Sequence, residues 1–265
     1  MRNTFYLFAL VSVLGFSSKK DSASLNPQNT AVILVDMQND FTEYGQGSLA
    51  VQGGQGTKKA YIKKVKNALN YLKNKKKLYV IGTQDWHPQG HVSFASAHQG
   101  KKPYVDVIYL DNTTHQVVDA NTKDAREQRL WPDHCVQGTK GAQLVKGIDK
   151  LVDVRVHKGT EKNLESYSGF YKGFYGPDDK RNIKSSLDGI LKKRNIKNVI
   201  VFGLANDFCV GATAKDGADL GYHVMFVKDL SEAVFGDEAT KKVCQEMEKK
   251  GIETMTFDVL KKRIK

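Results

Sequence analysis

Short apolar runs alternate along the chain with longer segments in which apolar residues recur every three or four positions. Continuous apolar runs are typical of strands buried on both faces of a sheet, and the periodic segments are typical of amphipathic helices. Strands are predicted at residues 31–35, 78–83, 153–157, 198–202, 223–227 and 253–257. Helices are predicted at residues 57–75, 185–194, 208–220 and 238–250.

This alternation predicts how the elements pack. Strands that are separated by helices run parallel, and right-handed crossovers place the helices over both faces of the sheet. The predicted fold class is therefore α/β, a single domain with a mainly parallel sheet flanked by helices on both faces, at residues 28–265. Residues 95–130 do not follow this alternation, because they are polar and lack periodicity until residues 122–128. A long segment of this kind predicts a functional loop or lid.

The start of the chain has a different pattern. Residues 5–16 are almost entirely apolar, Arg2 precedes them, and two serines and two lysines follow. This is the layout of a secretory signal, so we interpret residues 1–20 as a leader and expect export, with a cytoplasmic location as the alternative. A buried N-terminal helix is the other interpretation. No apolar run reaches the ~20 residues that a membrane-spanning helix needs.

The composition changes the predicted fold and domain organisation little. The 265 residues include 41 Lys and Arg against 29 Asp and Glu, a net charge of +12. A basic excess favours anionic partners, but these lysines are scattered and no nucleic-acid-binding motif accompanies them, so we interpret them as a solvated surface and expect no nucleic-acid partner. The three cysteines, Cys135, Cys209 and Cys244, are too few for a disulfide framework and are expected to be free thiols.

Four reactive side chains come directly after predicted strands: Asp36, Asp85, Lys158 and Cys209. The carboxyl ends of parallel strands meet at one edge of a sheet, where ligands bind, so we expect these side chains to converge. Cys209 falls in the first turn of a predicted helix, where the helix dipole lowers the pKa of a thiol and favours a nucleophile. A buried, inert cysteine is the alternative.

Asp85 and His87 indicate a metal site. Residues two apart in an extended segment project to the same side, so this carboxylate and this imidazole can chelate a cation. His91 and His134 offer further imidazoles. Such a donor set suits Zn²⁺, Fe²⁺ or Mn²⁺, whereas an ordinary core or surface role is the alternative for each histidine.

Several motifs around these residues are similar to those of one family, the nicotinamidases within the isochorismatase-like cysteine hydrolases. The matching segments are VDMQNDF at 35–41, GSLAV at 47–51, TQDWHP at 83–88, HVSFA at 91–95, LWPDHCVQGT at 130–139, KG at 158–159, YSGF at 167–170 and GLANDFCV at 203–210. They occur in the family's order over roughly residues 31–231. Two departures stand out: Asn206 replaces the usual Thr, and residues 106–129 are longer than in compact relatives.

The resemblance implies a catalytic triad. In it Cys209 is the nucleophile, Asp36 accepts the thiol proton, and Lys158 orients and tunes both. It further implies a cis peptide bond between Leu204 and Ala205, with the backbone amides of Ala205 and Cys209 forming the oxyanion hole.

The resemblance also implies one divalent metal ion, bound by Asp85, His87 and His134. Zinc is the expected metal and iron or manganese are the alternatives, while His91 is left open as a fourth ligand. The implied substrate-binding side chains are Phe41, Trp131 and Tyr167, which matches a small aromatic amide.

The implied activity is hydrolysis of nicotinamide to nicotinate and ammonia through a cysteine thioester, which feeds NAD salvage, with pyrazinamide as a further substrate. Another amide or ureide hydrolase of the same superfamily is the alternative, and such an enzyme would not need the metal ligands. The expected partner is a small-molecule substrate, and a homo-oligomer is left open.

Overall fold

The computed structural model describes residues 24–112, 114–123, 125–173 and 183–264. Its centre is a six-stranded, fully parallel sheet with the strand order β11-β10-β9-β1-β2-β6. The strands are β1 (Thr30–Val35), β2 (Tyr79–Asp85), β6 (Val154–Lys158), β9 (Asn198–Gly203), β10 (His223–Val227) and β11 (Glu253–Met255). All six predicted strands are present, with ends shifted by one or two residues.

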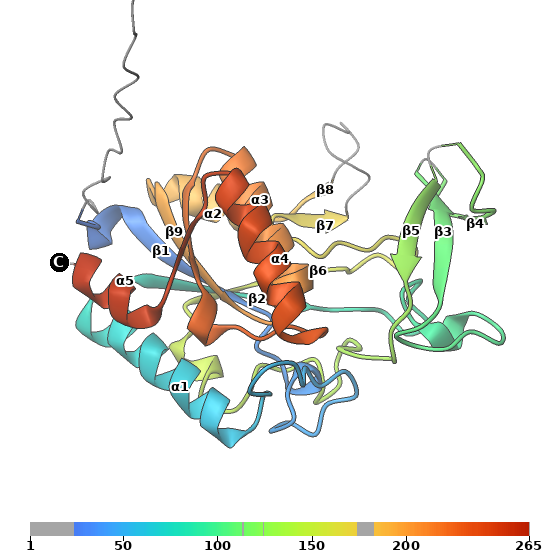
Figure 1. The fold of residues 1–265 in the computed structure, drawn as a ribbon, viewed down its shortest axis with the longest axis horizontal. Helices are drawn as coiled ribbons and strands as arrows, with labels where there is room; N and C mark the ends of the chain where they lie inside the picture. Colours follow the sequence, from blue (N-terminus) through green and yellow to red (C-terminus); the bar gives the residue numbers. More distant parts are fainter. Residues whose placement is uncertain (1–23, 113, 124, 174–182, 265) are drawn as a thin grey trace, which may run out of the picture.

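Helices cover both faces of this sheet, which confirms the predicted fold class (Figure 1). On one face lie α1 (Lys59–Asn70), which continues into a π-helical turn at Tyr71–Lys75, and α5 (Phe257–Arg263). On the other face lie α2 (Leu187–Lys193), α3 (Gly211–Asp219) and α4 (Gly236–Lys249). The third helix stops before Gly221, whose φ of 88° suits a glycine after a helix end.

The two faces have separate hydrophobic cores, and β1 contributes to both. All six of its residues are buried, and Val32 and Leu34 pack toward α1, whereas Ile33 and Val35 pack toward α2 and α3. This alternation follows from the two-residue repeat of a strand. A strand buried on both faces therefore reads as one continuous apolar run.

The prediction of a loop at residues 95–130 is wrong where the segment forms strands, while its role as a lid stays a prediction. This segment contains a second, antiparallel sheet, ordered β4-β3-β5, from β3 (Val107–Asp111), β4 (Val117–Val118) and β5 (Ala125–Arg129). We call residues 104–130 the arm, because this segment extends from one end of the main body (Figure 1). Its core is small, so few of its positions need apolar side chains, and the strands are held largely by backbone pairing. The core residues are Val92, Ala95, Ile108, Leu110 and Leu130.

Smaller differences occur elsewhere. The last strand ends at Met255, and the side chain of Thr256 caps α5, which the sequence pattern did not predict. A short hairpin, β7 (Tyr171–Gly173) with β8 (Ile183–Lys184), was also not predicted. Residues 1–20, interpreted as a leader, lie outside the described residues. In the described part of the chain, no helix is both long and apolar enough to span a bilayer.

Candidate active site

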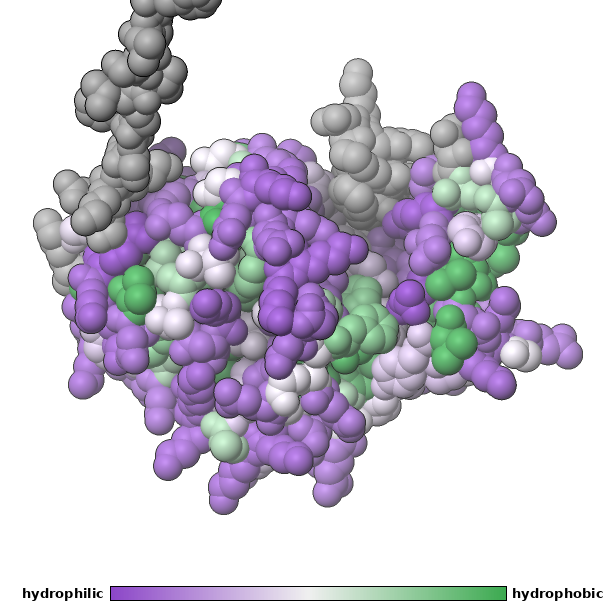
Figure 2. Space-filling view, viewed as in Figure 1, coloured by the Kyte–Doolittle hydropathy of each residue, from purple (hydrophilic) through white to green (hydrophobic). Residues whose placement is uncertain are grey.

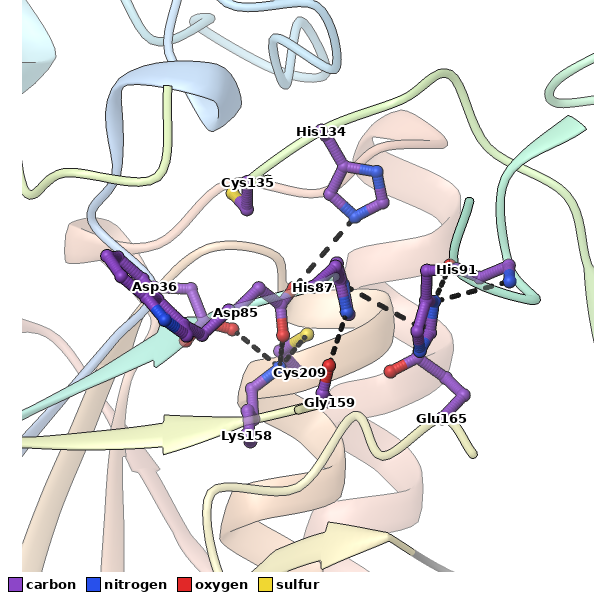
Figure 3. A network of polar contacts seen from close by, with 12 residues as sticks. Asp36, Asp85, His87, His91, His134, Cys135, Lys158, Gly159, Glu165 and Cys209 are labelled. Atoms are coloured by element: carbon purple, nitrogen blue, oxygen red, sulfur yellow. Dashed lines mark hydrogen bonds and ion pairs between the residues drawn. The ribbon is translucent and has the colours of Figure 1, made fainter. Parts of the chain in front are cut away.

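The four reactive side chains meet at the carboxyl edge of the main sheet (Figure 3). They come from the adjacent strands β9, β1, β2 and β6, which carry Cys209, Asp36, Asp85 and Lys158 at or just beyond their ends. Lys158 is at the centre and fully buried: its Nζ lies 3.0 Å from Asp36 Oδ2 and 3.3 Å from Cys209 Sγ. It also forms an ion pair with Asp85 Oδ1. The strand order thus explains why residues far apart in sequence share one site.

Asp36 is held by the neighbouring strand. Its backbone has a φ of 48°, a left-handed conformation that aspartate tolerates better than most residues. The backbone amide of Asp36 donates to the carbonyl oxygen and to the hydroxyl oxygen of Thr83. The Thr83 hydroxyl in turn donates a hydrogen bond of 2.6 Å to Asp36 Oδ1. Burial raises the pKa of Asp36 to about 6, although Lys158 opposes this shift. A carboxylate with such a pKa can accept a proton near neutral pH.

Cys209 differs from the sequence expectation. It lies in a π-helical turn, Asn206–Val210, that leads into α3. Its thiol is buried, and burial raises its pKa well above the usual value; Lys158 opposes this rise, while nearby carboxylates including Asp36 add to it. The expectation that the helix dipole lowers this pKa is therefore wrong, because burial outweighs it. Burial thus favours the protonated thiol, and attack by the sulfur needs a base.

The buried charges of the site do not balance among themselves. Three carboxylates, Asp36, Asp85 and Glu165, are clustered around the single ammonium of Lys158. Burial by itself would lower the pKa of Lys158, but the carboxylates raise it well above its usual range. The cluster therefore carries two excess negative charges when all four groups are ionised. Buried charges need partners. Although burial alone would lower the pKa of His87, Glu165 and Asp85 raise it, so a protonated His87 would supply one positive charge, whereas a divalent cation would supply two.

A metal-binding arrangement lies beside the lysine. Asp85 Oδ2 is 3.7 Å from His87 Nε2 and 4.0 Å from His134 Nε2, and the three donor atoms all lie within 4.8 Å of one another. The Nδ1 atoms of His87 and His134 contact the carbonyls of Gly159 and Pro132 at 2.8 and 2.7 Å. A carbonyl only accepts, so each Nδ1 carries a proton, and in the neutral imidazole each Nε2 then presents a lone pair.

These residues suit a divalent metal ion. His87 Nε2 is buried and has no hydrogen-bond partner among the residues that the structure describes, as expected of a ligand atom. Asp85 divides its two oxygens, because Oδ1 faces Lys158 while Oδ2 faces both histidines. One carboxylate thus joins the catalytic cluster to the metal cluster.

Gly159 allows His87 to take this position. Its φ is 59°, and a Cβ atom there would lie 2.4 Å from His87 Cε1. Only glycine therefore lets the backbone approach the imidazole closely enough to fix its tautomer.

His91 is not part of the Asp85 group. Its Nδ1 interacts with the Ser93 hydroxyl at 2.8 Å, and its Nε2 lies 3.4 Å from the Leu164 carbonyl. The ring stacks on His87 with the centroids 4.1 Å apart. Together with Glu165 and His87, His91 forms a second group of donor atoms, which shares His87 with the first group.

A cavity of about 30 Å³ lies beside Cys209. The three side chains that the resemblance assigned to substrate, Phe41, Trp131 and Tyr167, all line it, and so do Asp85 and His134. Ala205 also lines the cavity, and the peptide bond between Leu204 and Ala205 is cis. Within the described residues, the Ala205 amide donates to no acceptor.

Sequence reasoning missed three residues of this site. Thr83 could have been found, because it precedes Asp85 by two positions and so lies on the same side of β2. Phe208 precedes the nucleophile and lines the cavity, but its motif gives no orientation. Glu165 lies in a loop without periodicity or spacing, so no signal in the sequence pointed to it.

Comparisons with known proteins agree with this geometry. Residues 30–259 match the model of the isochorismatase domain. A nicotinamidase from Escherichia coli is 38% identical over 75% of this chain and 81% of its own length. A nicotinamidase from Acinetobacter baylyi is 35% identical over 86% of this chain and 92% of its own length.

Solved structures give the same result. An Acinetobacter baumanii nicotinamidase/pyrazinamidase superimposes with a TM-score of 0.72 at 31% identity, covering 88% of this chain and 99% of that one. A Pyrococcus horikoshii pyrazinamidase in complex with zinc superimposes with a TM-score of 0.60 at 29% identity, covering 86% of this chain and 99% of that one.

Proposed function

The chain belongs to the isochorismatase family, and from that premise we propose that it is a nicotinamidase, which hydrolyses nicotinamide to nicotinate and ammonia and so supports NAD salvage. Pyrazinamide, the ring analogue named for several relatives, is a further substrate. The single observation that carries the proposal is the junction at Asp85. Its two oxygens face a Cys-Asp-Lys cluster and a pair of metal-ligand histidines, and Asp85 itself lines the cavity beside Cys209. A ureide hydrolase of the same family would have no use for the second cluster.

The first step needs a base, because burial favours the protonated form of the Cys209 thiol. Asp36 is the acceptor: its carboxylate, Asp85 and the Cys209 sulfur all lie within 4.8 Å of one another. Lys158 lies between the two groups and contacts both, so it stabilises the thiolate as the proton moves to Asp36. The thiolate then attacks the amide carbon of the substrate.

The attack leaves negative charge on the amide oxygen. The free Ala205 amide is placed to donate to this oxyanion, with the Cys209 amide as the second donor. Asp36 returns its proton to the departing nitrogen, and ammonia leaves. A water molecule, activated by Asp36, hydrolyses the thioester to release nicotinate and restore the thiol.

The pocket walls position the ring. Phe41 and Trp131 supply apolar surface for a pyridine, and the Asp85, His87 and His134 donors would hold a divalent ion, for which we propose zinc. When bound, such an ion supplies a Lewis-acidic anchor for the ring nitrogen of nicotinamide.

The test is ammonia release by the purified chain from nicotinamide, with and without prior removal of metal by a chelator. We expect saturable turnover that chelation abolishes and added zinc restores. Absence of turnover on nicotinamide by metal-loaded protein, together with turnover on ureides, would overturn the assignment.

A further inference from the structure

Two aromatic side chains form one wall of the substrate cavity and separate it from a second space. Tyr167 and Phe208 line both the cavity of about 30 Å³ and a groove of about 430 Å³ between α3 and α4. Their ring centroids are 5.3 Å apart. The nucleophile is thus enclosed on this side by a partition that is a single layer of rings thick.

The groove beyond this partition can accept an apolar group. Phe235 lines it, is 51% exposed and packs on Phe208 with the centroids 5.9 Å apart. Figure 2 shows hydrophobic residues at the surface between α4 and the arm. An ion pair between Lys215 and Glu246, at 3.1 Å, supplies a polar rim. The groove therefore offers an aromatic surface with a charged border but no titratable group that the mechanism uses.

The two rings of the partition are held in different ways. The Tyr167 hydroxyl accepts a hydrogen bond of 3.3 Å from Trp131 Nε1, and Gln128 Nε2 lies 3.5 Å away. The Phe208 ring packs against Trp131, with the centroids 4.9 Å apart, and against Tyr167 and Phe235. Truncation of Tyr167 would disturb Trp131, whereas truncation of Phe208 removes the partition and leaves that hydrogen bond in place.

We propose that Phe208 is the specificity-determining residue that restricts the substrate to a single small ring, by closing the cavity off from the groove. The proposal rests on the proposed function, because it names the class of amide that the same site accepts. Without this side chain, the cavity and the groove become one space. An aryl group on the pyridine ring can then occupy the groove beside Phe235.

The experiment compares Phe208→Ala with the parental chain on nicotinamide and on a panel of nicotinamides that carry a phenyl group on different ring carbons. The measured quantity is the ratio of kcat/KM for each phenyl compound to that for nicotinamide. We expect this ratio to rise at least about tenfold for one member of the panel, the scale on which pocket shape discriminates substrates. Phe208→Leu keeps most of the wall and should stay close to the parental ratio.

Phe235→Ala is the matched control, because Phe235 lines the groove but not the cavity. An unchanged ratio in Phe208→Ala, or an equal rise in Phe235→Ala, would overturn the proposal. Since Phe208 adjoins the nucleophile, calorimetric binding of the same panel is also measured in the Cys209→Ala background with and without Phe208→Ala. Selective tightening of a phenyl compound supports the partition even if turnover is lost. Failure of the parental chain to turn over nicotinamide would instead count against the proposed function.

Discussion

The carboxyl edge of the main sheet and the arm both contribute to the substrate cavity, but in different ways: the edge lines it, whereas the arm contacts Tyr167, one of its lining residues. The edge brings Asp36, Lys158 and Cys209 together from three strands and buries them almost completely. The arm and the residue that follows it contribute Gln128 and Trp131, which hold Tyr167 from the outside. The comparison indicates that the edge supplies the reactive groups, whereas the arm sets the shape of the pocket. Changes at the edge should therefore lower kcat, and changes in the arm should raise KM.

The largest effect is expected at the nucleophile. Cys209→Ala should lower kcat by at least about 10⁴-fold, because the covalent route is lost while the fold remains. Ammonia release and thermal unfolding measure both properties. Cys244→Ala, a thiol on α4 that is half-buried and away from the site, should leave kcat unchanged. Appreciable turnover by Cys209→Ala would place the chemistry elsewhere than at the sheet edge.

The next effect concerns the metal donors. His87→Ala should reduce bound metal from about one ion per chain to a small fraction, and lower kcat/KM by about 100-fold or more, because three ligands become two. Metal content by atomic absorption and steady-state kinetics give the two values. His157→Ala is the control, since this half-exposed ring stacks on Trp86 outside the donor group. The same measurement on His91→Ala decides its role: a loss as large as that of His87→Ala would add it to the ligands.

A smaller effect on kcat/KM is expected when the pH is lowered. Asp36 acts as a base only when ionised, and burial, opposed by Lys158, places its pKa at about 6. The value of kcat/KM should therefore be constant above that pH and fall about tenfold for each unit below it, because the protonated fraction dominates there. A profile that stays flat down to pH 4.5 would exclude Asp36 as the base.

The smallest effect is expected in the arm. Gln128→Leu removes the weak hydrogen bond to Tyr167, together with the bond of 2.8 Å that the same Nε2 donates to the Arg129 carbonyl. The bond to Tyr167 is worth about 1 kcal/mol, so KM should rise about fivefold with kcat unchanged. The pH profile of this variant should match that of the parental chain. A fall in kcat instead of a rise in KM would show that the arm takes part in the chemistry and would remove the distinction between the two regions.

The main sheet and the arm also differ in how well the sequence predicts them. The central strands β1 and β9 could be predicted because they are buried on both faces and so form continuous apolar runs. The edge strand β6 is buried only at alternate positions. The convergence of Asp36 and Lys158 followed from parallel topology. In the arm, β5 could not be predicted, because it has the sequence Ala-Arg-Glu-Gln-Arg and only Gln128 in it is buried. β4 and β5 depend on backbone pairing, which leaves no periodic signal, whereas β3 buries Ile108 and Leu110 in alternation, a signal that the prediction missed.

The electrostatics of the site also could not be predicted from the sequence. The helix position of Cys209 suggested a low pKa, but the sequence does not reveal how deeply a thiol is buried or how many carboxylates surround it. Glu165 illustrates the same point, because a single acid in an aperiodic loop becomes significant only when the fold brings it 4.0 Å from His87.

The divided carboxylate of Asp85 makes the two clusters inseparable at this position. A substitution there that weakens the metal site also removes an ion pair of Lys158, so loss of metal and disturbance of the catalytic lysine occur together. Substitutions at His87 or His134, by contrast, change the metal site and leave that ion pair in place.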